Sequence, residues 1–249
     1  MKPAPFEYAA PESLEEALAL LDEDSKALAG GQSLVPLLNF RLARPARLVD
    51  LNRIPGHDHV REQDGSLRIG MLARQVRLTE LDAWPLLRDA VDHVGHPQTR
   101  NRGTVCGSAA HGDPAAELPA ALVALGARFH LCSPTGERTL PAEEFFVGFL
   151  TTALAPDELL VEIEVPPHPA EWRFVEYART HGDWAVVGAA VAGSRTVLFG
   201  VGQTPVVADS LDVVDDPWKR AFLEEALSGV GSTEPPESGG GGLPAPERK

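Results

Sequence analysis

Two neighbouring glycines, Gly30 and Gly31, lie in the stretch whose residue types are best suited to bind an anion. They follow a short apolar run and precede leucines at helical spacing, which indicates a strand, a turn and a helix. A ligand can approach the backbone closely there because glycine has no Cβ, and the free N–H groups at the start of a helix favour an anion. Gln32 and Ser33 add side-chain donors. We therefore predict a phosphate or pyrophosphate site at residues 29–34; the alternative is a turn that needs glycine only for its geometry.

A second stretch, residues 96–117, is dense in small and hydrogen-bonding residues. Its glycines permit tight turns, Thr104 and Ser108 offer hydroxyls, and Asp113 followed by proline is typical of a helix start. Glu117 could accept a hydrogen bond from a ribose hydroxyl or simply complement the helix dipole. A loop with free N–H groups beside the first turn would enclose a dinucleotide from both ends. The alternative is an ordinary buried loop.

Histidines and cysteines are too sparse to predict a metal site. His57 and His59 flank Asp58, but no third ligand is evident. Cys106 and Cys132 form no paired motif, which excludes a self-contained iron–sulfur cluster or a cysteine-based zinc site. Two unpaired cysteines are typical of a reducing compartment, so we expect a cytoplasmic protein.

The bulk composition narrows the class of protein. The chain of 249 residues is 43% hydrophobic and 23% charged, which is typical of a globular protein with ample core. Its formal net charge of -14 and pI of about 5.0 argue against nucleic acid or an anionic membrane as a partner. No apolar stretch approaches the ~20 residues of a membrane span, and the N-terminus lacks a signal-peptide pattern.

Three successive parts of the chain are predicted to position these residues. Residues 1–55 are predicted to form a small parallel βαβ unit, in which Ser13 and Glu16 form a capping box at the first helix. Its expected elements are a helix at 14–21, a strand at 26–29, a helix at 34–42 and a strand at 47–51.

The remaining parts are predicted from periodicity and turn residues. Residues 56–167 are expected to form a larger mixed or antiparallel sheet with helices, and residues 168–228 a small antiparallel sheet of three strands with a helix. The expected strands lie at 67–72, 128–132, 138–140, 158–165, 173–179, 184–192 and 196–201, and the expected helices at 78–81, 86–94, 115–125, 142–147 and 216–228. The composition of residues 229–249 predicts a disordered tail. The fold class is therefore α+β.

The two stretches together resemble the motifs of a known family. The sequence from Ala29 to Pro36, with residues 39–45 and 48–52, is similar to the first FAD motif of the FAD-binding medium subunits of molybdenum hydroxylases. This is the carbon monoxide dehydrogenase and xanthine dehydrogenase group. Residues 98–108 and 110–117 are similar to the second FAD motif. Both motifs occur in the order and spacing of the family, and the resemblance covers roughly residues 3–205.

The resemblance implies an FAD site and its contacts. The backbone of residues 29–34 would bind the pyrophosphate, residues 104–108 would hold the other side of the cofactor, and Glu117 would contact FAD. In the family an aromatic residue commonly follows Gly-Asp near the isoalloxazine ring, and here it is Trp184, which would stack on the flavin or gate access to it; a core tryptophan in a strand is the alternative. The implied contacts are Ala29, Gly30, Gly31, Gln32, Ser33, Leu34, Val94, Thr104, Cys106, Gly107, Ser108, Glu117, Leu160 and Trp184.

The sequence departs from the family pattern at two points. Cys106 stands where the second motif usually has glycine, so its thiol would contact the flavin or bond to it, or would be a tolerated small residue. The C-terminal part is also shorter than usual, which puts the usual docking on partner subunits in doubt.

The function implied by the resemblance is that of an FAD-carrying electron-transfer subunit. Its expected partners are a molybdopterin-binding large subunit and a small subunit with 2Fe–2S clusters, and its acceptor would be NAD, a quinone or oxygen. No residue of the chain is expected to act as acid, base or nucleophile toward the organic substrate, since the chemistry belongs to the cofactor. Two alternatives stay open: a standalone FAD-dependent oxidoreductase on the same scaffold, and a scaffold protein that no longer binds FAD.

Overall fold

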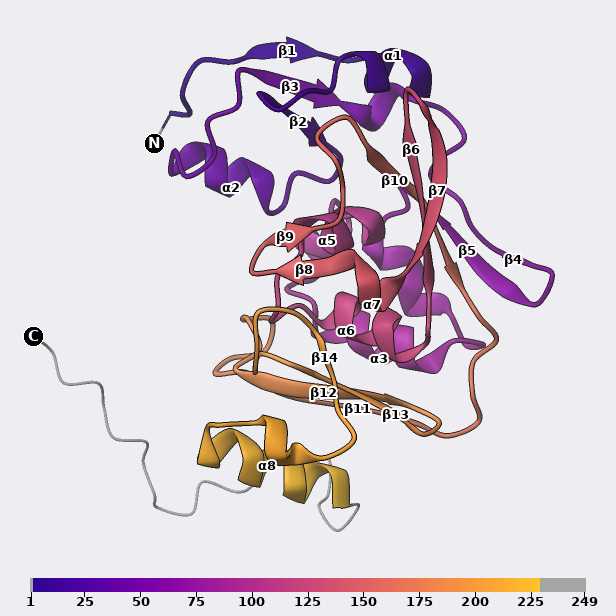
Figure 1. Cartoon of the computed structure of the whole chain (residues 1–249), viewed down its shortest axis with the longest axis vertical. Coiled ribbons are helices and arrows are strands. Elements are labelled where there is room, and N and C mark those ends of the chain that lie inside the picture. Colours follow the sequence, from indigo (N-terminus) through magenta and orange to yellow (C-terminus); the bar gives the residue numbers. More distant parts are fainter. Residues whose placement is uncertain (1, 229–249) are drawn as a thin grey trace, which may run out of the picture. The chain divides into compact units, whose positions relative to one another are not determined.

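The computed structural model describes residues 2–228 and divides the chain after Asp209 into two compact units. The first unit carries three larger sheets and the helices between them (Figure 1). These sheets lie within residues 7–50, 60–165 and 172–207. The subdomain boundaries near residues 55 and 167 stay predictions. No helix in the described part of the chain is long and apolar enough to span a lipid bilayer.

The first sheet is parallel and has three strands in the order β1-β3-β2. The strands are β1 (Glu7–Ala9), β2 (Ser25–Leu28) and β3 (Arg47–Asp50), with helices α1 (Leu14–Ala19) and α2 (Leu34–Asn39) and a 3-10 turn at Leu51–Arg53. The predicted capping residue is confirmed, because the Ser13 hydroxyl accepts the Glu16 N–H at 3.2 Å. The predictions missed β1, whose three residues are too few to show a pattern. Both helices end two to three residues earlier than predicted.

The second sheet is antiparallel and has the strand order β4-β5-β10-β6-β7. Its strands are β4 (Val60–Gln63), β5 (Ser66–Gly70), β6 (Arg128–Ser133), β7 (Gly136–Pro141) and β10 (Leu159–Val165). One face is apolar and buried, through Ile69, Phe129 and Ile163. Strand β4 was not predicted because its Val-Arg-Glu-Gln sequence is largely exposed and shows no apolar alternation.

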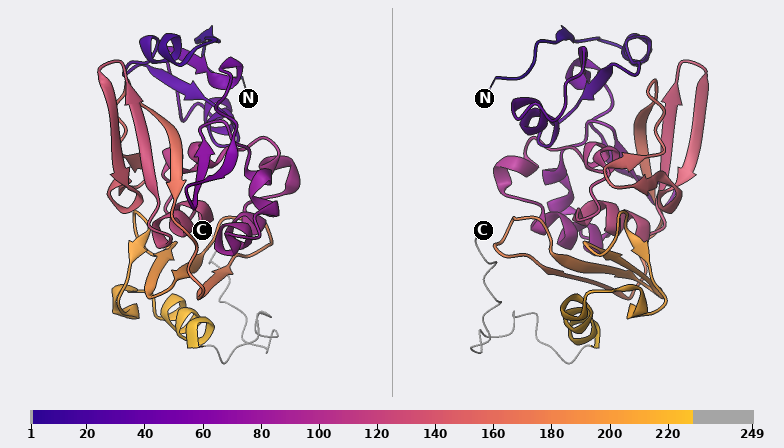
Figure 2. Two further views of the ribbon diagram at one scale, coloured as in Figure 1. Left: turned by 90° about the vertical axis from the view of Figure 1, so that its right-hand side faces the viewer. Right: turned by 60° about the vertical axis from the view of Figure 1, so that its left-hand side comes forward.

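Helices α3 (Pro85–His93), α5 (Val105–His111) and α6 (Glu117–Ala124) lie between the second sheet and the third (Figures 1 and 2). Helix α6 is buried along its whole length, because it contacts α3 and α5 as well as the third sheet. Shorter elements complete this part: a 3-10 helix at Gln75–Glu80, α4 (Pro97–Arg100), α7 (Ala142–Phe145), β8 (Phe146–Gly148) and β9 (Thr151–Thr152).

The third sheet is antiparallel and has four strands, where three were predicted. They are β11 (Trp172–Tyr177), β12 (Val187–Ala192), β13 (Arg195–Phe199) and β14 (Val206–Val207). The extra strand β14 has only two residues, too few to be read from periodicity. The predicted strand at 184–192 begins three residues late, at Val187, so Trp184 precedes the strand.

The second unit holds a 3-10 turn at Leu211–Val213 and helix α8 (Pro217–Ser228). The predicted helix at 216–228 is confirmed, with Asp216 as its N-terminal cap: the Asp216 carboxylate accepts the Trp218 and Lys219 N–H groups at 2.9 and 3.1 Å. The predicted tail at 229–249 lies outside the described residues.

Candidate functional site

A cavity of about 600 Å³ in the first unit brings the predicted site residues together. Strands of the first two sheets, the helices beside them and the loop between β11 and β12 contribute to its wall. All fourteen residues implied as FAD contacts line this one cavity, although they come from positions 29 to 184 of the chain. Its volume is within the range of ordinary small-molecule and cofactor sites.

The turn at residues 29–34 forms one wall of the cavity. Gly31 has a φ of +74°, a conformation that residues with a Cβ rarely adopt. Within residues 2–228 the backbone N–H groups of Gln32, Ser33 and Leu34 donate no hydrogen bond. The Ser33 hydroxyl does not cap the helix that follows. The turn therefore presents several unused donors beside the cavity, as an anion site requires.

The second stretch is not the loop that we predicted. Residues 105–111 form helix α5, whose N-cap Thr104 accepts the Gly107 N–H through its hydroxyl at 3.1 Å. The Ser108 N–H donates to the Thr104 carbonyl at 3.0 Å, and the Val105 N–H donates to Ala73. These N–H groups are thus used within the protein and are not free for a ligand. The sequence missed the helix because valine, cysteine, glycine and serine, the residues of its first turn, are weak helix formers.

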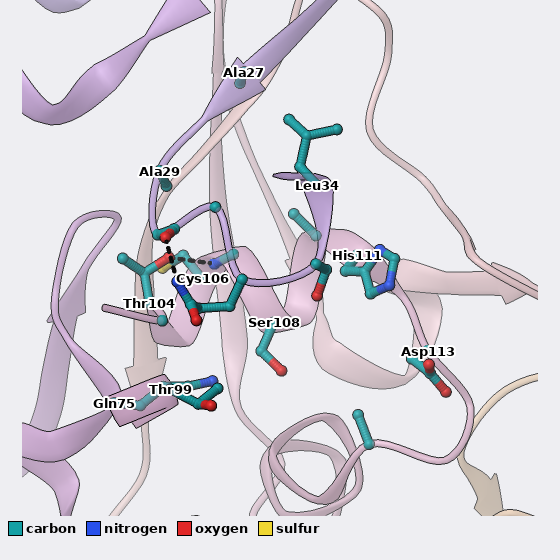
Figure 3. Close-up of a pocket in the computed structure, with 18 of the residues that line it drawn as sticks. Ala27, Ala29, Leu34, Gln75, Thr99, Thr104, Cys106, Ser108, His111 and Asp113 are labelled. Atoms are coloured by element: carbon teal, nitrogen blue, oxygen red, sulfur yellow. Dashed lines mark hydrogen bonds between the residues drawn. The ribbon is translucent and has the colours of Figure 1, made fainter. Parts of the chain in front are cut away.

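Side-chain donors compensate for this on the second side of the cavity. The Ser108 side chain lies between Gln75 and Thr99 on one side and His111 and Asp113 on the other (Figure 3). The Asp113 carboxylate accepts the Ala115 N–H at 2.8 Å, and the next helix begins only at Glu117. Asp113 therefore forms a turn before α6. Our prediction that Asp113 is the N-cap of this helix is wrong, because the N-cap is Ala116.

Buried polar groups on this side have unused hydrogen-bonding capacity. Gln75 is 5% exposed, and its Oε1 atom finds no partner among the described residues. Glu117 is 7% exposed, and burial raises the pKa of its carboxyl to about 7. Burial, with the charge of Glu117, raises the pKa of Glu176 on β11 to about 8. Glu176 does not line the cavity, whereas Gln75 and Glu117 do. Polar groups are costly to bury without a partner, so Gln75 and Glu117 favour a polar ligand in this cavity.

Cys106 is on α5 and is almost fully buried. Its thiol donates to the Ile69 carbonyl with a sulfur–oxygen distance of 3.8 Å. Burial raises the pKa of the Cys106 thiol far above its ordinary value, so the reactive thiolate is strongly disfavoured. These features favour the tolerated small residue over the covalent contact.

Trp184 lines the cavity from a loop between β11 and β12 and is 65% exposed. A core tryptophan, the alternative reading, would be buried, so this alternative is wrong. An exposed aromatic ring beside a cavity can contact a planar ligand. Because the ring is exposed, its removal should cost the fold little stability.

The sequence reasoning missed several residues of the cavity wall, notably Gln75, Thr99 and Gly95. No local pattern marks Gln75, which reaches the cavity because its N–H pairs with the Gly103 carbonyl at 2.9 Å. Among the candidate metal ligands, the His59 Nε2 atom lies 3.0 Å from Glu162. No group of three potential metal ligands exists among the described residues.

Comparison with known proteins agrees with this geometry. Residues 4–168 match the model of the FAD binding domain in molybdopterin dehydrogenase. The chain is 47% identical over 225 residues to the 6-hydroxypseudooxynicotine dehydrogenase complex subunit alpha of Paenarthrobacter nicotinovorans, covering 83% of this chain and 76% of that protein. It is 42% identical over 200 residues to the carbon monoxide dehydrogenase medium chain of Hydrogenophaga pseudoflava, covering 77% and 70%.

A solved structure shares the fold. The carbon monoxide dehydrogenase of Hydrogenophaga pseudoflava, in a form that lacks the Mo-pyranopterin moiety, superposes with a TM-score of 0.81 at 38% identity. The match covers 92% of this chain and 86% of that one. The unused donors at residues 32–34 and the unpartnered Gln75 oxygen fit a cofactor with both phosphate and polar ring groups. The chain therefore belongs to the FAD-binding subunits of the molybdenum hydroxylases, a family of oxidoreductases, and its cofactor is FAD.

Proposed function

We propose that this chain is the electron-transfer subunit of a three-subunit dehydrogenase or hydroxylase. A molybdopterin-binding large subunit would oxidise the substrate, and a small subunit would deliver electrons from 2Fe–2S clusters. The chemistry that FAD would supply in the cavity is to collect these electrons and release them to NAD, a quinone or oxygen. The observation that carries this proposal is the single cavity that joins the donor-rich turn at 29–34 to apolar residues and to exposed Trp184.

The residues of the chain would bind and orient the cofactor. The N–H groups of residues 32–34 would hold the pyrophosphate, and the Ser108 hydroxyl and Glu117 would accept or donate hydrogen bonds opposite them. Val94 and Leu160 would give apolar contact. The remaining assigned contacts are Ala29, Gly30, Gly31, Thr104, Cys106, Gly107 and Trp184. We assign no acid, base or nucleophile toward the organic substrate.

The supporting context comes from the relatives. Several are named as subunits of complexes, among them the Nicotine 6-hydroxylase medium subunit and the Caffeine dehydrogenase subunit beta. We propose the same kind of assembly for this chain, with FAD-binding subdomains at residues 1–55 and 56–167 and a third part at 168–228. The two free, buried cysteines support a cytoplasmic location.

The decisive experiment is to purify the full chain alone and together with the subunits encoded beside its gene. Alone, it should be yellow, with one FAD per chain, and should oxidise no small organic substrate. In the complex, adding the substrate should bleach the flavin absorbance.

Two results would contradict the proposal. Substrate oxidation by the isolated chain would favour the standalone oxidoreductase. A colourless chain that takes up no added FAD would favour the scaffold protein.

A further inference from the structure

We propose that Asn52 and Arg74 are positioning residues that act as one bridge between the two glycine-bearing turns of the cofactor site. This inference rests on the proposed function and deepens it, because it concerns the same cavity. Neither residue lines that cavity. Asn52 lines a separate cavity of about 430 Å³ on another side of the turn at residues 28–32. We therefore infer that the two residues act on the cofactor through the backbone that they hold.

The bridge runs from one turn to the other through three hydrogen bonds. The Asn52 Nδ2 atom donates to the Ala29 carbonyl at 2.9 Å. The Asn52 Oδ1 atom accepts from the Arg74 Nη2 atom at 2.6 Å. The Arg74 Nη1 atom donates to the Arg102 carbonyl at 2.5 Å. One guanidinium and one amide thus link the carbonyl before Gly30 to the carbonyl before Gly103.

The Asn52 amide is itself held in place. The Asp50 Oδ1 atom accepts from the Asn52 Nδ2 atom at 2.6 Å and from the Asn52 N–H at 3.0 Å. The Tyr8 hydroxyl donates to the other Asp50 oxygen at 2.5 Å. Because the carboxylate accepts from Nδ2, the Oδ1 atom of Asn52 is the one that faces Arg74. This orientation suits both ends of the bridge.

The two turns also meet directly. A Cβ on Gly30 would overlap the Arg102 carbonyl oxygen and would lie 2.8 Å from the Gly103 Cα atom. The first turn follows strand β2 and the second lies between helices α4 and α5, and close contact between glycines has no attraction of its own beyond dispersion. The three hydrogen bonds of the bridge, two of them charge-assisted, are directional. They can therefore fix the relative orientation of the two turns, which packing between glycines cannot do.

Holding a carbonyl also orients the N–H of the same peptide unit. A trans peptide is planar, so its C=O and N–H groups point in opposite directions. The bond from Asn52 to the Ala29 carbonyl therefore fixes the Gly30 N–H, at the start of the donor-rich turn. The Gly103 N–H, opposite the carbonyl held by Arg74, donates to Thr99 at 2.7 Å. The bridge thus sets the orientation of the first turn relative to the second.

The test uses the full chain with Asn52→Leu, Arg74→Met, and both changes together. Arg74→Lys is the conservative variant, since lysine keeps the charge but lacks the planar fork that bonds two oxygens at once. Arg47→Met is the matched control: Arg47 lies on β3, shortly before Asn52, and bonds Glu7 and Asp22, both at 3.2 Å, but no hydrogen bond joins it to either turn. The readouts are the Kd and dissociation rate of FAD by flavin fluorescence and the melting temperature of the flavin-free protein.

We expect each single variant to raise the Kd of FAD about tenfold, as expected for the loss of hydrogen bonds to charged groups. The double variant should bind FAD with the same Kd as the more weakly binding single variant, because removing either residue already breaks the bridge. Arg74→Lys should bind FAD as poorly as Arg74→Met while folding normally. Arg47→Met should lower the melting temperature with no change in the Kd of FAD.

Three outcomes would overturn the inference. An unchanged Kd in the single variants would show that the turns hold their geometry without the bridge. Effects that multiply in the double variant would show two independent residues. A normal Kd in Arg74→Lys would show that the charge, and not the bridge, is what matters. Failure of the unaltered chain to bind FAD would instead refute the proposed function itself.

Discussion

The two turns that meet beside the candidate cofactor cavity are built in opposite ways. In the first, residues 29–34, the N–H groups of residues 32–34 donate no hydrogen bond to any described residue, and the Ser33 hydroxyl makes no capping hydrogen bond. The second, residues 103–108, uses its N–H groups at Val105, Gly107 and Ser108 to fasten helix α5. The first turn therefore offers donors to a ligand, whereas the second supports the first and contributes side chains.

This difference predicts which substitutions affect binding and which affect stability. A change in the donors of the first turn should weaken the cofactor with little cost to the fold. A change in the second turn should lower the stability of the fold first. The contact between Gly30 and residues 102–104 belongs to both turns, so it should affect both properties.

The largest effect is expected for Gly30→Ala. The new Cβ would overlap the Arg102 carbonyl and lie 2.9 Å from the Thr104 nitrogen, and backbone atoms cannot move aside cheaply. The free energy of unfolding should fall by about 2 kcal/mol or more, with loss of FAD binding. Thermal unfolding and flavin fluorescence measure the two effects.

Gly148→Ala is the matched control for Gly30→Ala, because its Cβ would meet only the Thr151 Cβ at 3.9 Å. If both variants lost stability equally, the close contact between the turns would not be the cause.

The second effect concerns pH and the buried carboxyl of Glu117. Its pKa in the folded protein, about 7, is above the ordinary value of 4.5, so folding favours the neutral form. This stabilisation is fully present below pH 4.5 and is lost as pH rises through about 7. Glu117→Gln keeps a neutral side chain, so the melting temperature of the flavin-free variant should exceed that of the unaltered chain by more at pH 8 than at pH 5.

Comparing the two proteins at each pH removes the contribution of groups that do not interact with Glu117. A difference in melting temperature that stayed constant from pH 5 to pH 8 would show that Glu117 does not titrate in this window. Glu176→Gln offers a second check, since its carboxyl has a pKa raised to about 8.

A smaller loss of stability is expected for Thr104→Val, which keeps the shape of the side chain but removes the cap of α5. The Gly107 N–H would lose its partner at 3.1 Å, and the free energy of unfolding should fall by about 1 kcal/mol. For a protein of this size that corresponds to a melting temperature lower by about 2–4 °C. A loss of FAD affinity without a loss of stability would contradict the structural role of this cap.

The smallest effect on stability is expected for Ser33→Ala. The Ser33 side chain makes no capping hydrogen bond, so the free energy of unfolding should change by less than about 0.5 kcal/mol. The Kd of FAD should nevertheless rise, because a donor beside the pyrophosphate is lost. Isothermal titration of the flavin-free protein measures this change; an unchanged Kd together with an unchanged melting temperature would place Ser33 outside the site.

Much of the fold followed from local patterns. The Ser13 cap, the apolar alternation of β6 and the helix begun by Asp216 were predictable because each depends on residues close together in the sequence. The misses share a different origin. β1 and β14 are too short for a pattern, β4 has no apolar alternation, and α5 begins with residues that disfavour helix. Each of these elements forms because neighbouring elements supply its hydrogen bonds and packing.

By itself the sequence predicted a ligand site at two glycine-bearing stretches, Gly30–Gly31 and Thr104–Ser108, because glycine and hydroxyl residues are visible in a local pattern. Each stretch kept a purely structural alternative until the family resemblance joined the two into one FAD site. Only the tertiary structure showed which of the two leaves its N–H groups free, because the Val105 N–H donates to the Ala73 carbonyl, which lies far away in the sequence. It also decided that Gln75 and Glu117 are buried at the cavity and that Asn52 and Arg74 link the turns. Burial and long-range hydrogen bonds depend on what lies nearby in space, which one-dimensional patterns do not contain.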